Sequence, residues 1–186
     1  MSPEGRLAAL PALTERPVDR MECARCPTPC GPVELCVRDG RLAAVKLPGP
    51  RTRASRRDGG SPAARRFAAA LARHFLGEPT GVDAEDLDMA GCTAFEQRVY
   101  RALLQVEFGR LITYGELAAQ AGRPGAARAV GQAMGRNPWP IFVPCHRVVA
   151  AGGRVGGFSA GPEWKARLLE HEGWTMVDGR LKEAHR

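Results

Sequence analysis

The sequence has no long apolar run. Nowhere in its 186 residues do apolar side chains continue for the roughly 20 positions that a helix needs to cross a bilayer. Near its start there is only a short apolar patch at 7–10, which Pro11 interrupts and Glu4 precedes, so it does not resemble a signal peptide. We therefore expect a cytoplasmic protein without a membrane partner.

Internal repeats are also absent, and a chain of 186 residues can form one ordinary domain or two small domains that share an interface. The net charge of +7 and the pI of about 9.5 favour a polyanionic partner, because phosphate contacts release counterions and steer association. Charge alone does not identify a nucleic-acid-binding protein, since many Arg-rich proteins bind no nucleic acid.

Six cysteines in a cytoplasmic chain indicate metal ligands, catalytic thiols or core residues rather than a disulfide framework. Cys23, Cys26, Cys30 and Cys36 crowd into 14 residues and hold enough thiolates for a zinc site. Their spacing is not that of a standard zinc finger, and Cys30 and Cys36 fall where packing also explains them. A structural zinc and plain packing both stay open.

The first half of the chain reads as an extension followed by an α/β unit. Residues 1–22 are rich in Pro and Arg without periodicity, which predicts a flexible extension. Within 23–90, apolar alternation over 33–37 and a turn signal at 39–40 predict a β-hairpin. Helical spacing over 63–76 predicts a helix.

The second unit, residues 91–176, reads as a set of short helices. Spacing and capping residues predict helices over 94–106, 115–121, 126–134 and 162–172. The tight glycine turn between the second and third helices is typical of a helix-turn-helix. We expect a Gly-rich hairpin over 152–161 and a C-terminal tail over 177–186.

The segment from Pro144 to Val148 carries the most specific pattern. It contains a Cys-His pair that follows an apolar run, and a second proline-containing turn, Asn137-Pro138, lies just upstream. Most isolated Cys-His pairs have no catalytic role. Here prolines restrict the backbone around the thiol, and a glycine-rich segment follows that can shape a pocket.

Residues 95–174 resemble the catalytic domain of the O6-alkylguanine-DNA alkyltransferases, and the hairpin region near 28–47 resembles that family more weakly. The residues that carry the resemblance are the Pro-Cys-His-Arg-Val core, its upstream Asn-Pro and its downstream Gly-Gly-Phe-Ser. The resemblance implies an α+β fold with a ribonuclease-H-like N-terminal α/β domain and a winged-helix-like, helix-turn-helix C-terminal domain.

The resemblance also implies roles in catalysis. Cys145 matches the alkyl acceptor, His146 the base that acts on it through a water, and Glu172 the carboxylate that orients the histidine. Tyr114 matches the tyrosine that donates a proton or hydrogen bond to the base ring. Asn137 matches the residue that links the DNA-reading helix to the cysteine segment.

The expected guanine pocket contains Tyr114, Val148, Phe158 and Ser159. Phe158 departs from the tyrosine often found there, so stacking is expected without a hydroxyl contact.

For DNA binding, Arg128 matches the arginine that fills the space left by a flipped nucleotide. Small neighbours allow close approach to the minor groove. The expected DNA-contacting set also includes Thr113, Ala126, Ala127, Ala129 and Gly131.

Together these features predict a monomeric protein that binds double-stranded DNA and repairs O6-alkylguanine, and also O4-alkylthymine, without a required cofactor. A lesion sensor of the same fold is the main alternative, but such proteins lack the reactive cysteine that Cys145 supplies. A cysteine hydrolase would leave the Arg128 helix unexplained. A zinc-dependent regulator would need base-specific readout, which an alanine-lined helix supplies poorly.

Overall fold

The computed structural model describes residues 21–47 and 60–184. Except for its last two residues, the predicted extension over 1–22 therefore lies outside the described residues. None of the described helices is long and apolar enough to span a membrane.

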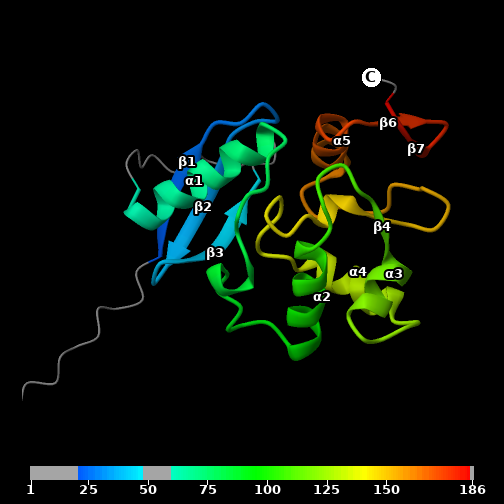
Figure 1. Ribbon diagram of the computed structural model, residues 1–186, viewed down its shortest axis with the longest axis horizontal. Coiled ribbons are helices and arrows are strands. Elements are labelled where there is room, and N and C mark those ends of the chain that lie inside the picture. The colour runs from blue at the N-terminus through cyan, green and yellow to red at the C-terminus, as the bar shows by residue number, and fades with distance from the viewer. Residues whose placement is uncertain (1–20, 48–59, 185–186) are drawn as a thin grey trace, which may run out of the picture.

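A three-stranded antiparallel sheet forms the N-terminal part (Figure 1). Its strands are β1 (Glu22–Cys26), β2 (Val33–Arg38) and β3 (Arg41–Lys46), in the order β1-β2-β3. The predicted hairpin is present, because Asp39 and Gly40 adopt positive φ values of 48° and 77° in the turn between β2 and β3.

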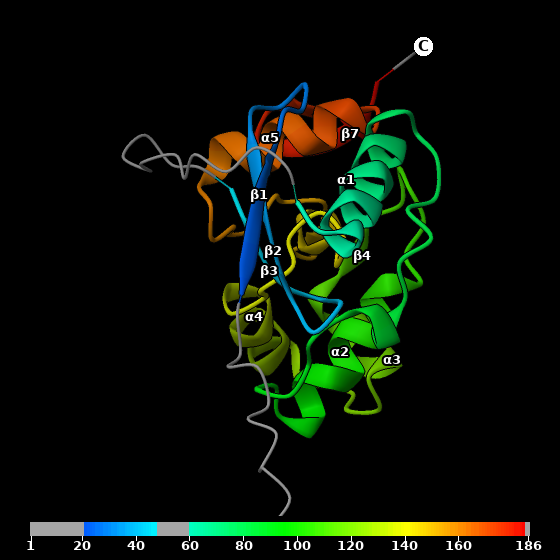
Figure 2. The ribbon, with the colours of Figure 1, turned by 90° about the vertical axis from the view of Figure 1, so that its left-hand side faces the viewer.

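Helix α1 (Pro62–Phe75) lies against this sheet (Figure 2). The Ser61 side chain accepts a hydrogen bond from the Ala64 N–H, and a proline at the first helical position favours the start of the helix there. Its buried face, which includes Phe67 and Leu71, packs into the core.

A helical region follows, built from α2 (Ala94–Leu104), α3 (Tyr114–Gln120) and α4 (Ala127–Gly135), after a short 3-10 turn, η1 (Ala84–Asp86). Thr93 and Thr113 begin α2 and α3 with capping boxes, as their side chains predicted. The turn between α3 and α4 spans 121–126, so both predicted helices and the turn between them are observed within one or two residues.

Two short strands connect this region to the cysteine segment. β4 (Ile112–Thr113) pairs in parallel with β5 (Val148–Val149), and the 3-10 turn η2 (Cys145–Arg147) directly precedes β5. This pairing brings the start of α3 beside the Cys145 segment. Helix α5 (Pro162–His171) comes next, after the Gly-rich loop.

The expected C-terminal tail is largely a hairpin. β6 (Trp174–Val177) and β7 (Arg180–Glu183) pair antiparallel around a turn at Asp178 and Gly179, which have φ values of 50° and 73°. The Asp-Gly pair is a strong hairpin signal that the sequence interpretation did not use at this position. Over 152–161, by contrast, only a tight turn closed by the Ala150–Arg154 bridge forms, and the rest is irregular.

One hydrophobic core joins the sheet and the helical region. The Trp139 indole N–H donates to the Leu42 carbonyl at 2.6 Å, and the Val45 N–H donates to the Pro138 carbonyl at 2.7 Å. The Phe67 ring meets the Phe142 ring edge-on, with 6.2 Å between centroids. These contacts hold the segment just before Cys145 against the N-terminal sheet and α1.

Candidate active site

Cys145 lies in a tightly constrained turn. Its backbone N–H donates to the Val143 carbonyl at 2.7 Å, Pro144 precedes it, and only 4% of the residue is exposed. Cys145 and the following His146 lie in the 3-10 turn η2, and Cys145 lines a pocket that His146 does not line.

His146 is fully buried and contacts a carboxylate. Its Nε2 lies 2.8 Å from Glu172 Oε1, while its Nδ1 is buried and has no hydrogen-bond partner among the described residues. Burial lowers the His146 pKa, and the negative charge of Glu172 opposes that shift. The imidazole is thus held neutral, with one ring nitrogen fixed and the other available.

Glu172 ends α5 and is held by a residue that sequence reasoning missed. Arg147 Nε and its terminal nitrogen donate to both Glu172 oxygens at 2.8–3.1 Å, and the Gly109 N–H adds a further bond at 3.2 Å. Burial would raise the Glu172 pKa, but His146 and Arg147 together hold it well below its usual range. The carboxylate therefore stays charged.

The Cys145 thiol does not ionise readily by itself. Burial raises its pKa to about 11, although the Asn137 side chain and the nearby Lys165 charge act in the opposite direction. A base is therefore needed to generate thiolate at neutral pH.

Lys165 is the second residue that sequence reasoning missed. Its ammonium group is fully buried on α5 and donates to the Val148 carbonyl at 2.7 Å and the Gly157 carbonyl at 3.4 Å. Burial lowers its pKa to about 8. It lies seven residues before Glu172, a helical spacing that places both on one face and that the sequence could have revealed.

Cys145 opens into a pocket of about 290 Å³. Three of the four residues expected around guanine line it, namely Tyr114, Phe158 and Ser159. Val148 does not line the pocket, because its side chain is fully buried and its carbonyl is bonded to Lys165.

The absence of a side chain at Gly156 leaves room for Tyr114. A Cβ on Gly156 would lie 3.0 Å from the Tyr114 hydroxyl, and a Cβ on Gly131 would lie 3.9 Å from its ring. Burial raises the Tyr114 pKa, and the nearby Cys145 adds to this shift, so the hydroxyl keeps its proton.

Asn137 joins the end of α4 to the cysteine segment. Its Nδ2 donates to the Val143 carbonyl at 2.9 Å, and its Oδ1 accepts from the Trp139 N–H at 3.0 Å. The Asn137 side chain therefore holds together the two ends of the loop over 137–143, which leads to Cys145.

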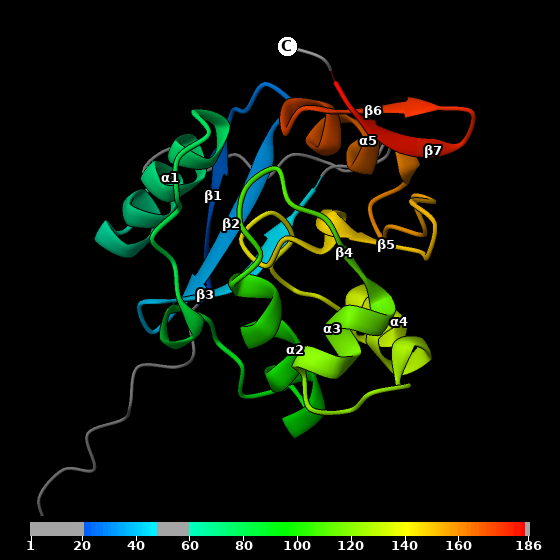
Figure 3. The same ribbon diagram turned by 45° about the vertical axis from the view of Figure 1, so that its right-hand side comes forward.

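Arg128 is exposed in the first turn of α4, next to a row of small residues. The other expected DNA-contacting residues, Thr113, Ala126, Ala127, Ala129 and Gly131, are all partly exposed. In Figure 3, α3 and α4 lie on one side of the molecule, with the Gly-rich loop above them.

A larger cavity, of about 490 Å³, has His74, Phe108 and Arg147 among its lining residues. It does not include Cys145, so it is not the reaction pocket. His74 comes from α1, is 2% exposed, and lies 3.9 Å from Glu172 Oε1. Burial lowers its pKa to about 3.

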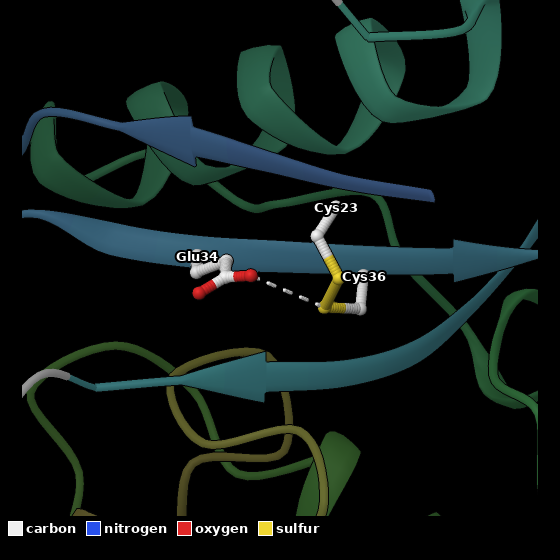
Figure 4. Close-up of side chains that lie close together, drawn as sticks. All are labelled: Cys23, Glu34 and Cys36. Carbon is white, nitrogen blue, oxygen red and sulfur yellow. Dashed lines mark hydrogen bonds between the residues drawn. A yellow bond between two sulfur atoms is a disulfide. The ribbon is translucent and has the colours of Figure 1, made fainter. Parts of the chain in front are cut away.

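The four N-terminal cysteines do not form a common site, which corrects the zinc expectation. Cys23 and Cys36 lie opposite each other on β1 and β2 and form a disulfide beside Glu34 (Figure 4). Cys26 lies three residues along β1, so it faces the other side of the sheet, where it lines a groove against α1. Cys30 is buried as a free thiol, as packing predicts.

Comparisons with known proteins identify the family to which the chain belongs. Residues 94–174 match the family model described as 6-O-methylguanine DNA methyltransferase, DNA binding domain. A methylated-DNA–protein-cysteine methyltransferase of Mycobacterium leprae is 41% identical over 155 residues, which cover 82% of this chain and 92% of that protein. The chain belongs to the methylated-DNA–protein-cysteine methyltransferase family.

Other members of this methyltransferase family are also similar. The Mycobacterium tuberculosis H37Rv protein is 52% identical over 102 residues, which span 55% of this chain and 61% of that protein, less than two thirds of its length. The crystal structure of Mycobacterium tuberculosis OGT in complex with DNA has a TM-score of 0.66 at 39% identity and covers 81% of this chain and 92% of that one.

The matched methyltransferase domain contains every expected catalytic, pocket and DNA-contacting residue, from Thr113 to Glu172. It also contains Arg147 and Lys165. It does not contain His74, and β7 lies beyond its end.

Proposed function

We propose that this protein removes the alkyl group from O6-alkylguanine in double-stranded DNA and retains it on Cys145. The observation that carries the proposal is the position of the thiol between two environments. On one side it lines a pocket with Tyr114 and Phe158, and outside that pocket the turn continues into the buried His146–Glu172 pair.

The first step is removal of the thiol proton. Because burial raises the Cys145 pKa to about 11, His146 must accept the proton. Its Nε2 faces the carboxylate and carries a hydrogen in the neutral ring, so Nδ1 is the acceptor. A bridging water carries the proton to it, and Glu172 stabilises the resulting cation.

The thiolate sulfur then bonds to the alkyl carbon while the bond from that carbon to O6 breaks. The electron pair of the broken bond stays on guanine, and the Tyr114 hydroxyl supplies a proton or hydrogen bond to the ring. Overall, one proton passes from the thiol to the released guanine. The thioether has no good leaving group, so each molecule reacts once.

Alkyl transfer requires the target nucleotide to leave the stack, since O6 is not reachable inside the duplex. We assign this step to α4, on which Arg128 is exposed and the neighbouring side chains are small enough for close approach to a minor groove. O4-alkylthymine presents a similar oxygen-linked alkyl group and is a second substrate.

We also assign a ribonuclease-H-like domain to 23–90 and a winged-helix-like domain to 91–176. The antiparallel sheet with one packed helix supports the first assignment, and the α3–α4 pair joined by a short turn supports the second.

Intact-protein mass spectrometry tests the proposal. Mixing the protein with a duplex that holds one O6-methylguanine should add one methyl group per molecule, on the peptide that contains Cys145. Cys145→Ala should add none. Binding of the duplex without any gain in mass would instead support a lesion sensor that does not react.

A further inference from the structure

We propose that the C-terminal hairpin carries a second DNA-contact surface, which binds the phosphate backbone beside the flipped nucleotide. The surface consists of Arg154, Arg180 and Lys182, which we name the hairpin cation face. This inference rests on the proposed function and adds a binding surface to it. β7 lies after residue 174, where the match to the family domain ends.

The hairpin is attached to the loop that shapes the pocket. The Leu181 N–H donates to the Gly153 carbonyl at 2.9 Å, and Arg154 and Arg180 pair across an antiparallel bridge. The Ala150 N–H donates to the Arg154 carbonyl at 2.8 Å and closes the turn before it. Arg154 is therefore held beside β7.

The three cations share one face of this small sheet. Arg154 and Arg180 are directly opposite across the bridge, and Lys182 lies two residues along β7, so strand alternation returns it to the same side. All three are exposed. Within 21–47 and 60–184, none of them has a carboxylate oxygen within 4.0 Å.

The carboxylates of the hairpin do not neutralise this face. Glu183 alternates to the opposite side of β7, and Asp178 lies in the turn at the far end. Like charges directly opposite on paired strands destabilise a sheet. An anionic partner would remove that repulsion, so the face fits a polyanion.

The position of the face identifies the polyanion as the DNA that carries the lesion. Ser159 of the pocket is only five residues after Arg154, so the two backbones lie within about 18 Å even if the loop were fully extended. In Figures 1 and 3, the α3–α4 pair, the loop and the hairpin follow one another along one side of the molecule. DNA seated on α4 therefore passes close to the hairpin.

The salt dependence of DNA binding tests this proposal. The variant Arg154→Gln/Arg180→Gln/Lys182→Gln should lower the slope of log affinity against log salt by about 0.9 for each phosphate that the variant no longer neutralises, or two to three units in all. The control Arg25→Gln/Arg41→Gln/Arg65→Gln removes three exposed cations of the sheet region and should leave the slope close to that of the wild type.

A second measurement distinguishes DNA binding by these cations from a structural role in stabilising the Gly-rich loop. Alkyl transfer from free O6-methylguanine base should be equal in the hairpin variant and the wild type, because that substrate has no phosphates. Equal salt slopes for the two triple variants would overturn the proposal, as would a hairpin variant that loses reactivity toward the free base. If the wild type reacts with neither DNA nor free base, the proposed function itself is wrong.

Discussion

Cys36 and Cys145 are both buried, with 0% and 4% of their surfaces exposed, but their sulfurs are in different chemical states. Cys36 is bonded to Cys23 across two paired strands, whereas Cys145 is a free thiol in a turn. The register of β1 and β2 places Cys23 directly opposite Cys36. The helical region instead brings to Cys145 a pocket, a neutral histidine and a charged carboxylate.

Burial alone therefore does not decide what a cysteine does. It raises the pKa of the Cys145 thiol, and the Asn137 side chain and the Lys165 charge oppose this shift without cancelling it, so a base is needed to form the thiolate. Among the described residues, the Cys23–Cys36 pair has Glu34 and no histidine within reach. In the sheet, one pair of cysteines stabilises the structure, and in the helical region Cys145 is the reactive thiol. Five experiments test this difference between the two regions.

Glu172→Gln should have the largest effect. It removes the charge that supports His146 and leaves Arg147 buried without a counter-ion, which costs about 3–5 kcal/mol in comparable sites. We expect single-turnover alkyl transfer to slow by about 10²- to 10⁴-fold, and urea unfolding to show the stability loss. Glu170→Gln, an exposed neighbour on α5, is the control and should change neither quantity.

Cys23→Ser/Cys36→Ser should affect stability alone. The disulfide closes a loop with a sequence separation of 13, which corresponds to about 3 kcal/mol in the chain-entropy estimate. Alkyl transfer at 25 °C should be unchanged, because Cys145 does not depend on this pair. Loss of transfer in the folded double variant would contradict the division of roles. Cys26→Ser, on the other face of β1, serves as the control for loss of a thiol.

The two regions meet at His74, which predicts a pH dependence of stability. Its folded pKa of about 3 lies below the unfolded value of about 6.5, so the unfolded chain binds more protons between these values. The stability that His74 contributes is complete above pH 6.5 and is lost as the pH falls toward 3. The lowered pKa of His146 acts in the same direction.

His74→Phe should therefore flatten the acid side of the stability curve. The slope of the unfolding free energy should fall by up to about 1.4 kcal/mol per pH unit, the value for one proton. Denaturant unfolding at several pH values between 4 and 7 measures it. Arg73→Gln, which removes an exposed cation from the same helix, is the control. Equal slopes in both variants would mean that His74 does not link the regions through its charge.

Several features of the fold can be predicted from short stretches of the sequence alone. The caps at Thr93 and Thr113, the first hairpin and the α3–α4 turn are local features, and the sequence predicted them correctly. The Asp178-Gly179 turn has the same Asp-Gly signal as Asp39-Gly40, so the second hairpin could also have been predicted from the sequence.

Other features depend on contacts between distant segments. The zinc alternative treated Cys23 and Cys26 as one half-site, whereas strand alternation sends their side chains to opposite faces of the sheet. The Glu172 environment brings together His74, Gly109 and Arg147, which are far apart along the chain. No single window of sequence contains that information.

Lys165→Met should have a moderate effect confined to the reaction pocket. Lys165 donates hydrogen bonds to both the Val148 and the Gly157 carbonyl, so the variant removes a constraint on the loop that contains Phe158. We expect alkyl transfer to slow about tenfold, equivalent to about 1.4 kcal/mol, with DNA affinity unchanged. Arg167→Met on the exposed side of α5 should not slow transfer. A tenfold loss of DNA affinity would show that Lys165 acts outside the pocket.

Phe158→Tyr should have the smallest effect. Phe158 lines the pocket through a half-buried ring, and a tyrosine keeps that ring while adding one hydroxyl at its edge. Because stacking depends on the ring face, transfer from O6-methylguanine should change by less than about threefold, or 0.7 kcal/mol. The ratio of rates for a benzyl and a methyl adduct is the sharper measurement, since it cancels changes in DNA binding. A tenfold change in that ratio would mean that the edge of residue 158, and not its face, determines which adducts the pocket accepts.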